Sequence, residues 1–400
     1  METILEKYYG FKNLKKEQKE IIDCVLKGND CIGLLPTGYG KSLCFQVPAL
    51  VMDGITIVIT PLIALMQDQV RNLRKRGIEA YYINSLQSVI EQREVYKNIC
   101  SNKAKIIYVS AERLESKQFI LQMRNVKIAL IVCDEAHTLL WSEDFRKALG
   151  HIPSFIEKIG YRPVHLALTA TATAITTEKI TKYLKLKKPK VVVGNVDREN
   201  IYYKIIRTNH KLKEVVSIIS KHKGELGIIY CLTIKNVNYL YKYLINIGYK
   251  VGLYHGCLDS TEKIIMQNNF SNHIIDVIIC TNAFGMGVDI PDIRYVIEYD
   301  LPICIEDYVQ QSGRGSRDGK LAVSYLLFSV DDIKTANYFI EHLSNSEKSE
   351  AELEEIRKEK YKKLDKMIDL ALTRGCIHKY ICNYFGQKHN GKCGMCSNCR

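Results

Sequence analysis

The sequence lacks an apolar segment long enough to cross a membrane. No apolar run reaches the roughly 18–20 residues that a bilayer-spanning helix requires. Residues 1–10 carry charges where a secretory signal would have an apolar stretch. The chain also shows no repeat of the length that builds solenoid folds. We therefore expect an intracellular protein that has no membrane partner and folds into globular domains.

Disulfides are not expected either, although the chain has 14 cysteines. Five of them lie inside apolar, strand-like runs, where a free thiol behaves as a small hydrophobic group: Cys31, Cys44, Cys133, Cys231 and Cys280. Four others lie near the C-terminal end with metal-ligand spacing. This usage is typical of a reduced compartment.

Acidic residues are in the minority. The chain has 57 Lys and Arg against 44 Asp and Glu, which gives a net charge of +13. Such an excess favours a polyanionic partner such as nucleic acid, because neutralising phosphates releases condensed counterions. Many basic proteins nevertheless bind no anion specifically, so the charge alone leaves the function open.

Short apolar runs alternate with helix-patterned stretches, which predicts parallel sheets with crossover helices. The expected strands are 31–35, 55–59, 106–109, 128–133 and 165–168, then 227–231, 251–254, 277–280, 295–297 and 322–328. A Lys-rich, Pro-containing passage at 184–195 separates the two series and is a candidate hinge. We expect an α/β fold with one lobe over residues 1–195 and another over 196–335. A helical module would follow over 336–400, with the Glu- and Lys-rich stretch 344–366 as a solvated helix face.

A phosphate-binding loop is predicted at residues 36–42, where Pro-Thr-Gly-Tyr-Gly-Lys-Ser joins an expected strand to a helix pattern. In such a loop the glycines let backbone N–H groups surround phosphates, the lysine adds a cation and the hydroxyl reaches Mg²⁺. The expected nucleotide-binding residues are Thr37, Gly38, Gly40, Lys41 and Ser42. Leu35 stands where a glycine is usual, so an accidental turn is the competing interpretation.

Two carboxylates follow the strand at 128–133, at the expected carboxyl edge of a parallel sheet. Asp134 would hold Mg²⁺ through water, and Glu135 would polarise the attacking water. An acidic helix start is the alternative interpretation. The phosphate loop earlier in the chain favours the catalytic one.

Two arginines three positions apart, Arg314 and Arg317, lie in a Gly-rich segment of the second lobe. Two arginines so spaced at a helix end could reach the γ-phosphate from the second lobe, as an arginine finger does. A surface Gly/Arg turn is the alternative, and the segment alone would not decide between them.

In this order the three elements resemble superfamily 2 helicases, and further motifs resemble the RecQ family over residues 9–399. The segment Phe284-Gly-Met-Gly287 is the strongest single match. The resemblance implies two RecA-like parallel-sheet lobes. It also implies that Phe11 stacks on adenine, that Gln18 reads the base edge and that Asp289 lines the nucleotide cleft. Lys15 stands where this family usually has an arginine, and Lys cannot stack as a planar guanidinium does.

The resemblance also implies a set of single-strand DNA contacts: Asn84, Ser85, Arg113, Trp141, Phe145, Arg146 and Thr281. Polar contacts of this kind position the sugar-phosphate backbone without reading sequence. The Trp141 loop resembles the aromatic-rich loop that couples strand binding to ATP hydrolysis, although Glu143 stands at a usual histidine position. The alternative is that Trp141 and Phe145 are helix-spaced core residues.

A zinc site is predicted from the last cysteines. Cys393, Cys396 and Cys399 are spaced three apart, and Cys376 lies seventeen residues before Cys393. Four thiolates suit a tetrahedral, structural Zn²⁺ that contributes folding energy. Cys382 competes with Cys376 as the fourth ligand, and the resemblance to the RecQ zinc module favours Cys376.

These features lead to the hypothesis of an ATP-dependent DNA helicase, with ATP and Mg²⁺ clamped between the lobes. The RecQ resemblance implies 3′-to-5′ movement, forked or tailed duplex substrates and a role in DNA repair or recombination. We expect a monomer. Many RecQ proteins continue with a winged-helix domain and a further helical domain, and neither pattern occurs in these 400 residues. An RNA helicase or RNA sensor, and a non-enzymatic DNA-binding scaffold, are the two rivals.

Overall fold

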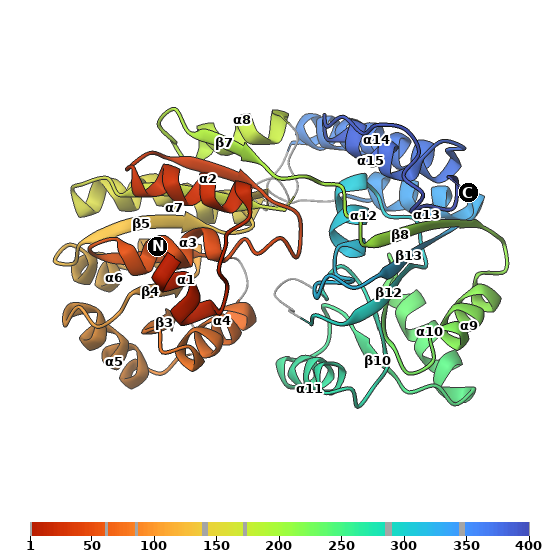
Figure 1. Ribbon diagram of the computed structural model, residues 1–400, viewed down its shortest axis with the longest axis horizontal. Coiled ribbons are helices and arrows are strands. Elements are labelled where there is room, and N and C mark those ends of the chain that lie inside the picture. The colour runs from red at the N-terminus through yellow and green to blue at the C-terminus, as the bar shows by residue number, and fades with distance from the viewer. Residues whose placement is uncertain are drawn as a thin grey trace. The chain divides into compact units, whose positions relative to one another are not determined.

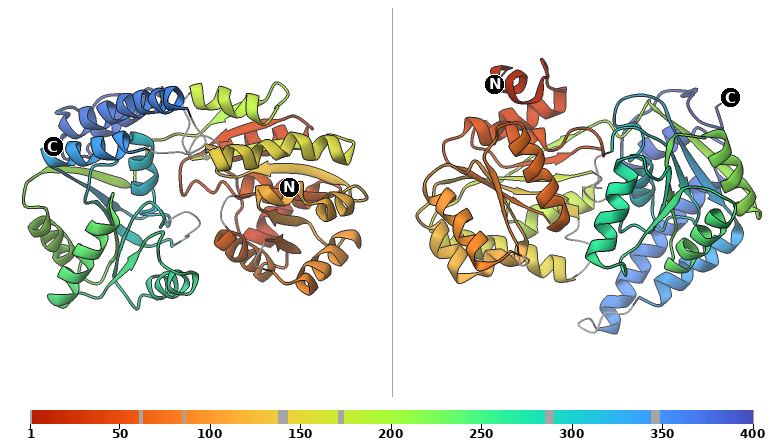
Figure 2. Two further views of the ribbon diagram at one scale, coloured as in Figure 1. Left: turned by 180° about the vertical axis from the view of Figure 1, so that it is seen from behind. Right: turned by 90° about the horizontal axis from the view of Figure 1, so that it is seen from below.

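The computed structural model describes residues 2–60, 63–84, 87–137, 143–170, 174–284, 290–343 and 349–399. The chain forms two compact units that divide between Asn195 and Val196. Each unit contains a sheet with helices packed against its faces (Figures 1 and 2). Among the residues described, no helix is both long enough and apolar enough to span a bilayer.

The first unit is built on a seven-stranded sheet with the order β3-β4-β2-β5-β6-β1-β7, whose described pairs are parallel. Its strands are β1 (Cys31–Leu34), β2 (Ile55–Ile59), β3 (Ala80–Ile83), β4 (Ile106–Val109), β5 (Ile128–Cys133), β6 (Val164–Thr169) and β7 (Lys190–Val193). Strand β7 lies inside the passage expected to be a hinge, so that prediction was wrong for these four residues. Parallel pairing brings the carboxyl ends of β1 and β5 to one edge of the sheet.

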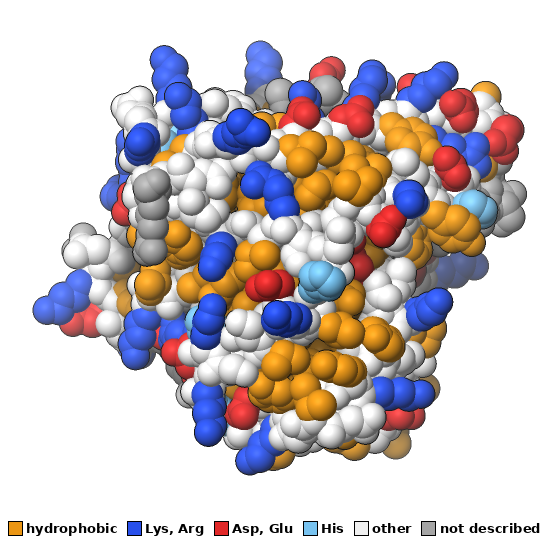
Figure 3. Space-filling view, turned by 90° about the vertical axis from the view of Figure 1, so that its right-hand side faces the viewer, with side chains coloured by type: hydrophobic (Ala, Val, Ile, Leu, Met, Phe, Trp, Pro, Cys, Tyr) orange, Lys and Arg blue, Asp and Glu red, His pale blue; other side chains and the backbone are white. Residues whose placement is uncertain are grey.

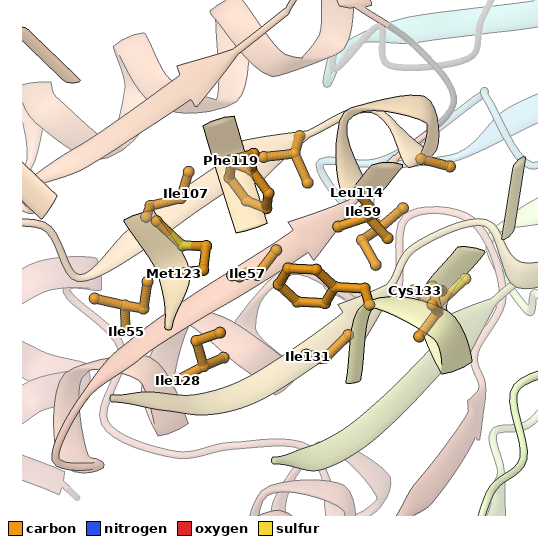
Figure 4. Packing of buried hydrophobic residues seen from close by; sticks show 14 of the residues in the cluster. Ile55, Ile57, Ile59, Ile107, Leu114, Phe119, Met123, Ile128, Ile131 and Cys133 are labelled. Carbon is orange, nitrogen blue, oxygen red and sulfur yellow. The ribbon is translucent and has the colours of Figure 1, made fainter. Parts of the chain in front are cut away.

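Helices cover both faces of this sheet. They are α1 (Glu2–Tyr9), α2 (Lys16–Leu26), α3 (Leu43–Val51), α4 (Ile63–Lys75), α5 (Val89–Cys100), the 3₁₀ helix η1 (Ala111–Glu115), α6 (Lys117–Met123), α7 (Glu143–Ile159) and α8 (Ala174–Tyr183). Successive strand side chains point to opposite faces, so Ile57 packs in one core with Phe119 while Val58 packs in the other with Phe45. Figure 4 shows the first of these cores, with Ile57 close to isoleucines of the neighbouring strands.

The second unit has a six-stranded sheet with the order β10-β11-β9-β12-β13-β8, again with parallel pairs. Its strands are β8 (Ile201–Arg207), β9 (Leu226–Tyr230), β10 (Val251–Tyr254), β11 (Val277–Cys280), β12 (Ile293–Glu298) and β13 (Ala322–Phe328). The helices around it are α9 (Lys211–Lys221), α10 (Ile234–Asn246), α11 (Ser260–Ser271) and α12 (Ile305–Ser312). Strand β8 has no counterpart among the strands expected from the sequence.

Gly227 in β9 is required by its neighbour in β12. A Cβ atom built on Gly227 would lie 2.0 Å from Cζ of Tyr295, whose ring is fully buried. The ring therefore occupies the space that any other residue at position 227 would need. This close approach sets the packing of two central strands.

Three C-terminal helices complete the second unit: α13 (Val330–Glu341), α14 (Glu350–Leu372) and α15 (Ile377–Tyr384). They share one hydrophobic core with the sheet, in which Met367 and Ile381 pack with Tyr203 and Leu326. The helical module is thus joined to the second lobe through a common core. Figure 3 shows one face of this unit, where Lys, Arg, Asp and Glu side chains are spread among hydrophobic and neutral groups.

Candidate active site and zinc site

The phosphate loop connects the carboxyl end of β1 to the start of α3, the strand–turn–helix setting that anion binding requires. Gly38 and Gly40 have φ angles of +77° and +85°, a region that glycine enters without steric strain. Thr37 is buried and Ser42 is half-buried at the entrance to α3. The sequence prediction of this loop therefore falls at the sheet edge where a phosphate-binding loop belongs.

The acidic pair lies at the same edge, directly after β5. Lys41 Nζ is 3.2 Å from Oε1 of Glu135 and 3.4 Å from Oε2. The backbone N–H of Asp134 donates to Ile59 O at 2.9 Å, which extends the sheet pairing to the first carboxylate. Glu135 has a φ of +50°, a left-handed conformation that turns the chain sharply after Asp134. The fold thus brings together the lysine and the two carboxylates that the sequence predicted.

Electrostatics distinguish these two carboxylates. Burial, and then the negative charge of Glu135, raise the pKa of Asp134 to about 6, while Lys41 acts in the opposite direction. A buried carboxylate beside a second one lacks enough positive charge around it. A divalent cation at this place would supply that charge. Carboxylate oxygens, which the acidic pair offers, are the ligands that Mg²⁺ prefers.

His137 and Thr169 extend the site to the next strand. Nδ1 of His137 lies 2.8 Å from Oγ1 of Thr169, at the end of β6, and 3.5 Å from Oε2 of Glu135. This chain of contacts joins the acidic pair to the segment that follows β6. From the sequence, His137 belonged to the box of the acidic pair and Thr169 to a segment that resembles the link between hydrolysis and unwinding, but their contact was not predicted, because it depends on the pairing of β5 with β6.

The predicted nucleobase residues lie beside the phosphate loop. The Nε2 amide of Gln18 donates to Tyr39 O at 2.9 Å and to Gly40 O at 3.1 Å. Lys15 Nζ lies 4.1 Å from the centroid of the Tyr39 ring, as in a cation–π contact. Phe11 is 52% exposed, so its side chain is accessible to a ligand. No sequence pattern connected Lys15 with Tyr39.

The predicted DNA contacts are placed only in part. Arg113 Nη2 donates to Asn84 O at 3.0 Å, so these two residues are neighbours in the first unit. Thr281 follows β11 in the second unit, and its N–H donates to Tyr254 O at 3.1 Å. Phe145 and Arg146 belong to α7, but the structure does not describe their side chains. The remaining predicted residues outside the described ranges are Ser85, Trp141 and Asp289.

The two arginines follow α12 in the second unit. Arg314 is buried and Arg317 is half-buried. The loop that carries them contacts the start of β12, where Ser316 N donates to Ile293 O at 2.9 Å, and Asn200 O, just before β8, accepts from Ala322 N at the start of β13 at 3.0 Å. Asn200 and the neighbouring Arg198 contact this loop through their side chains as well, which sequence reasoning did not expect.

The four predicted zinc ligands come together. The sulfur atoms of Cys376, Cys393, Cys396 and Cys399 all lie within 4.8 Å of one another. A tetrahedral Zn²⁺ with bonds near 2.3 Å places its sulfur atoms roughly 3.8 Å apart, which is the distance between Sγ of Cys393 and Sγ of Cys399. Cys382 is buried in the neighbouring helix and does not belong to this group. The donor set therefore fits structural zinc.

The cysteine cluster is attached to the edge of the second sheet. Tyr203 N in β8 donates to Met395 O at 3.2 Å, and Ser397 N donates to Tyr203 O at 2.9 Å. His378 is buried, with Nδ1 2.5 Å from Asp197 and Nε2 3.1 Å from Met395 O. The cysteine loop thus covers the open edge of β8 as a short additional strand would.

Comparison with protein-family models gives three consecutive matches. Residues 15–180 match a DEAD/DEAH box helicase model, and residues 210–319 match a helicase conserved C-terminal domain. Residues 330–400 match a RecQ zinc-binding model. The three matches follow the order of the phosphate loop, the arginine loop and the cysteine cluster.

Whole-chain relatives extend this likeness. The chain is 37% identical over 402 residues to "ATP-dependent DNA helicase RecQ" of Bacillus subtilis, covering all of this chain and 66% of the relative. It is 38% identical over 347 residues to "Probable ATP-dependent DNA helicase RecS" of the same organism, covering 85% of this chain and 69% of the relative. The chain spans between 61% and 66% of the length of three bacterial RecQ relatives.

A solved structure shares the fold. The DUF1998 helicase MrfA, in a crystal structure bound to DNA, aligns with a TM-score of 0.69 at 18% sequence identity. The alignment covers 95% of this chain and 54% of that one. At this identity the likeness concerns the fold alone.

Proposed function

This chain belongs to the RecQ family, and from that premise we propose that it is an ATP-dependent DNA helicase moving 3′ to 5′ on single-stranded DNA. One observation carries the proposal: Lys41 and Glu135 meet at the carboxyl edge of the first sheet, beside the phosphate loop. A lysine, a buried aspartate and a glutamate at that edge are the parts that phosphoryl transfer to water requires.

The proposed chemistry assigns each residue one task. Backbone N–H groups of Gly38–Ser42 hold the phosphates, and Lys41 exchanges its contact with Glu135 for the phosphate oxygens. Asp134 and the Ser42 hydroxyl would hold Mg²⁺, which neutralises phosphate charge when bound. Glu135, released from Lys41, orients the attacking water. Arg314 and Arg317 would stabilise the negative charge that develops on the transferred phosphoryl group.

The nucleobase and DNA roles rest on the family. Phe11 would stack on adenine while Gln18 reads its edge, and Asp289 would line the nucleotide site. Single-stranded DNA would be held by the residues predicted from the sequence: Asn84, Ser85, Arg113, Trp141, Phe145, Arg146 and Thr281. Their hydroxyl, amide and aromatic groups favour sequence-tolerant binding. The net charge of +13 supports such a polyanionic partner.

The zinc module would be structural. Four thiolates close the coordination of Zn²⁺ and leave no position for a reacting water. Zinc would therefore hold the cysteine loop against β8 without taking part in hydrolysis.

We propose that the protein acts as a monomer inside the cell, on forked or tailed duplexes that arise in repair and recombination. Such an activity separates strands, which is why helicases of this kind are also grouped with isomerases.

The experiment is ATP hydrolysis by the purified chain, alone and with saturating single-stranded DNA or RNA. We expect strong stimulation by DNA and weaker stimulation by RNA, followed by unwinding of 3′-tailed but not 5′-tailed duplexes. Greater stimulation by RNA than by DNA would identify RNA, in place of DNA, as the substrate. A folded, zinc-loaded chain without hydrolysis under any condition would instead support a DNA-binding scaffold.

A further inference from the structure

The loop of the two arginines contains a residue in a strained conformation. Ser316 lies between Arg314 and Arg317 and has a φ of +58°, in the left-handed region that residues with a Cβ rarely occupy. It is also buried. The backbone at position 316 sets the direction in which the chain leaves toward Arg317. Whatever stabilises this conformation therefore controls where Arg317 points.

Asn200 supplies that stabilisation from the segment before β8. Its Nδ2 amide donates to Ser316 O at 2.9 Å and lies 2.6 Å from the Ser316 hydroxyl. A third contact reaches Lys320 O at 3.5 Å. All three contacts from this one amide group go to the loop of the arginines, and two of them go to the strained residue itself.

Arg198 holds the preceding turn of the same loop. Its guanidinium donates to three carbonyls of this turn: Gly313 O at 3.5 Å, Gly315 O at 3.4 Å and Ser316 O at 3.2 Å. Its Nε donates to Asn200 Oδ1 at 3.2 Å, so the two side chains orient each other. A planar guanidinium suits this task because its donors point in fixed directions.

Arg198 also affects Arg317 through charge. Burial, and the nearby positive charge of Arg317, lower the pKa of the Arg198 guanidinium. Two like charges at short range repel each other. The loop has further anchors before and in β12: Arg294 forms an ion pair with Asp318, Ser316 N donates to Ile293 O at 2.9 Å, and Asp318 N donates to Pro291 O at 3.1 Å.

We propose that Asn200 and Arg198 are positioning residues that hold the left-handed turn at Ser316 and so aim Arg317 at the transferred phosphoryl group. This inference rests on the proposed function and deepens it, because it adds two residues outside the helicase motif that carries the arginines. Neither residue touches the nucleotide in this scheme. Both act through the loop.

The side chain of Asn200 can be tested apart from the backbone at that position. Its carbonyl oxygen accepts from Ala322 N, so the β8–β13 register begins with a main-chain contact that Asn200→Ala retains. The matched control is Asn246→Ala, an exposed position at the end of α10. Both variants would be compared with the unaltered chain in DNA-stimulated ATP hydrolysis, in single-strand binding and in thermal unfolding.

We expect Asn200→Ala to lower kcat about tenfold, because small displacements of a catalytic group have large effects on rate. The KM for ATP and the Kd for single-stranded DNA should stay within about twofold of the unaltered chain, since no phosphate, base or DNA contact is removed. Asn246→Ala should leave all three values unchanged. A kcat for Asn200→Ala equal to that of the control would overturn the proposal.

A double-mutant cycle with Arg317→Ala separates positioning from general stability. If Asn200 acts through Arg317, adding Asn200→Ala to Arg317→Ala should produce no further loss of turnover. Radiolabelled ATP makes the small residual rate measurable. A further tenfold loss in the double variant would mean that Asn200 supports the enzyme by another route, and the proposal would fail.

Ser316→Gly provides the rescue. Glycine adopts the left-handed turn without strain and without a hydroxyl that needs a partner. In the Asn200→Ala background this change should restore kcat at least threefold, while unrestored turnover would contradict the role of the turn. Hydrolysis is measured first in the unaltered chain. If that chain does not hydrolyse ATP, the proposed function itself has failed, and this outcome is distinct from a failure of the positioning role.

Discussion

Lys41 Nζ lies 3.2 Å from Oε1 of Glu135, a residue 94 positions away along the chain. Both side chains are largely shielded, with exposed fractions of 13% and 16%. The contact exists because β1 and β5 belong to one parallel sheet, which places the two loops after them at the same edge. It pairs the lysine cation with the glutamate carboxylate.

The first prediction concerns this pair. Lys41→Ala should weaken ATP binding at least tenfold, because it removes the cation that would contact phosphate oxygens. Glu135→Gln should retain ATP binding but lower turnover at least a hundredfold, because the group that orients water is lost. Fluorescent-nucleotide binding and phosphate release measure the two effects. Lys19→Ala, an exposed lysine in α2, is the charge control. Normal turnover in either active-site variant would remove the assignment.

The second prediction concerns acid stability of the first unit. Burial, and then the charge of Arg162, lower the pKa of His165 to about 4, below its ordinary value of 6.5. Between these values the unfolded chain binds a proton that the folded chain does not, so stability falls as the pH decreases from 6.5 toward 4. The loss should be on the order of 1–2 kcal/mol at pH 5.

Urea unfolding between pH 7 and 5 measures this slope. His165→Leu should flatten it, because the titrating group is gone, whereas replacing the exposed His210 by Leu should not. Asp30 acts in the same direction: hydrogen bonds from Arg162 and Lys187 outweigh burial and hold its pKa below the usual range. Its stabilisation is present above the ordinary pKa of 3.8 and is lost as the pH falls below that value, so it does not contribute to the slope between pH 7 and 5. An unchanged slope in His165→Leu would exclude the histidine as its source.

The third prediction concerns the cysteine cluster. Cys393→Ser should lower bound zinc well below one ion per chain and lower the Tm by roughly 5 °C or more, because the loop paired with β8 loses its anchor. Metal analysis and calorimetry provide the measurements. Cys382→Ala is the matched control, since its thiol lies in α15 outside the cluster. Loss of zinc in the control, with zinc retained in Cys393→Ser, would reverse the ligand assignment.

The fourth prediction concerns the packing of β9 against β12. Gly227→Ala should destabilise the second unit by about 1–3 kcal/mol, because a Cβ at this position overlaps the buried Tyr295 ring. Gly150→Ala is the comparison: this helical glycine of α7 has nothing within 4 Å of an added Cβ. That change should stabilise the chain by about 0.5–1 kcal/mol. Equal stability of the two variants would show that the ring moves aside freely.

Three strands were not anticipated, and each has a physical reason. Strand β3 contains Tyr81 and Tyr82 and is only partly buried, so it lacks the continuous apolar run of a central strand. Strand β7 lies at the edge of the sheet, and three of its four residues are exposed. Because it also begins with a lysine, its sequence resembles that of a linker. Strand β8 alternates between buried and half-buried residues and begins directly after the polar segment at residues 197–200. Edge strands depend on the neighbour that they pair with, and a local pattern does not contain that neighbour.

The sequence by itself determined the α/β class, the phosphate loop, the acidic pair and the last three cysteines of the zinc site, because each depends on residue types at short spacing, whereas Cys376 was chosen over Cys382 by family resemblance. Only the tertiary structure decided which distant groups meet: Lys41 with Glu135, His137 with Thr169, Lys15 with Tyr39, and Asn200 with Ser316. These contacts depend on sheet order and on left-handed turns. Neither is encoded in a short window of sequence, since both arise when separate strands pair and bring their loops to one edge.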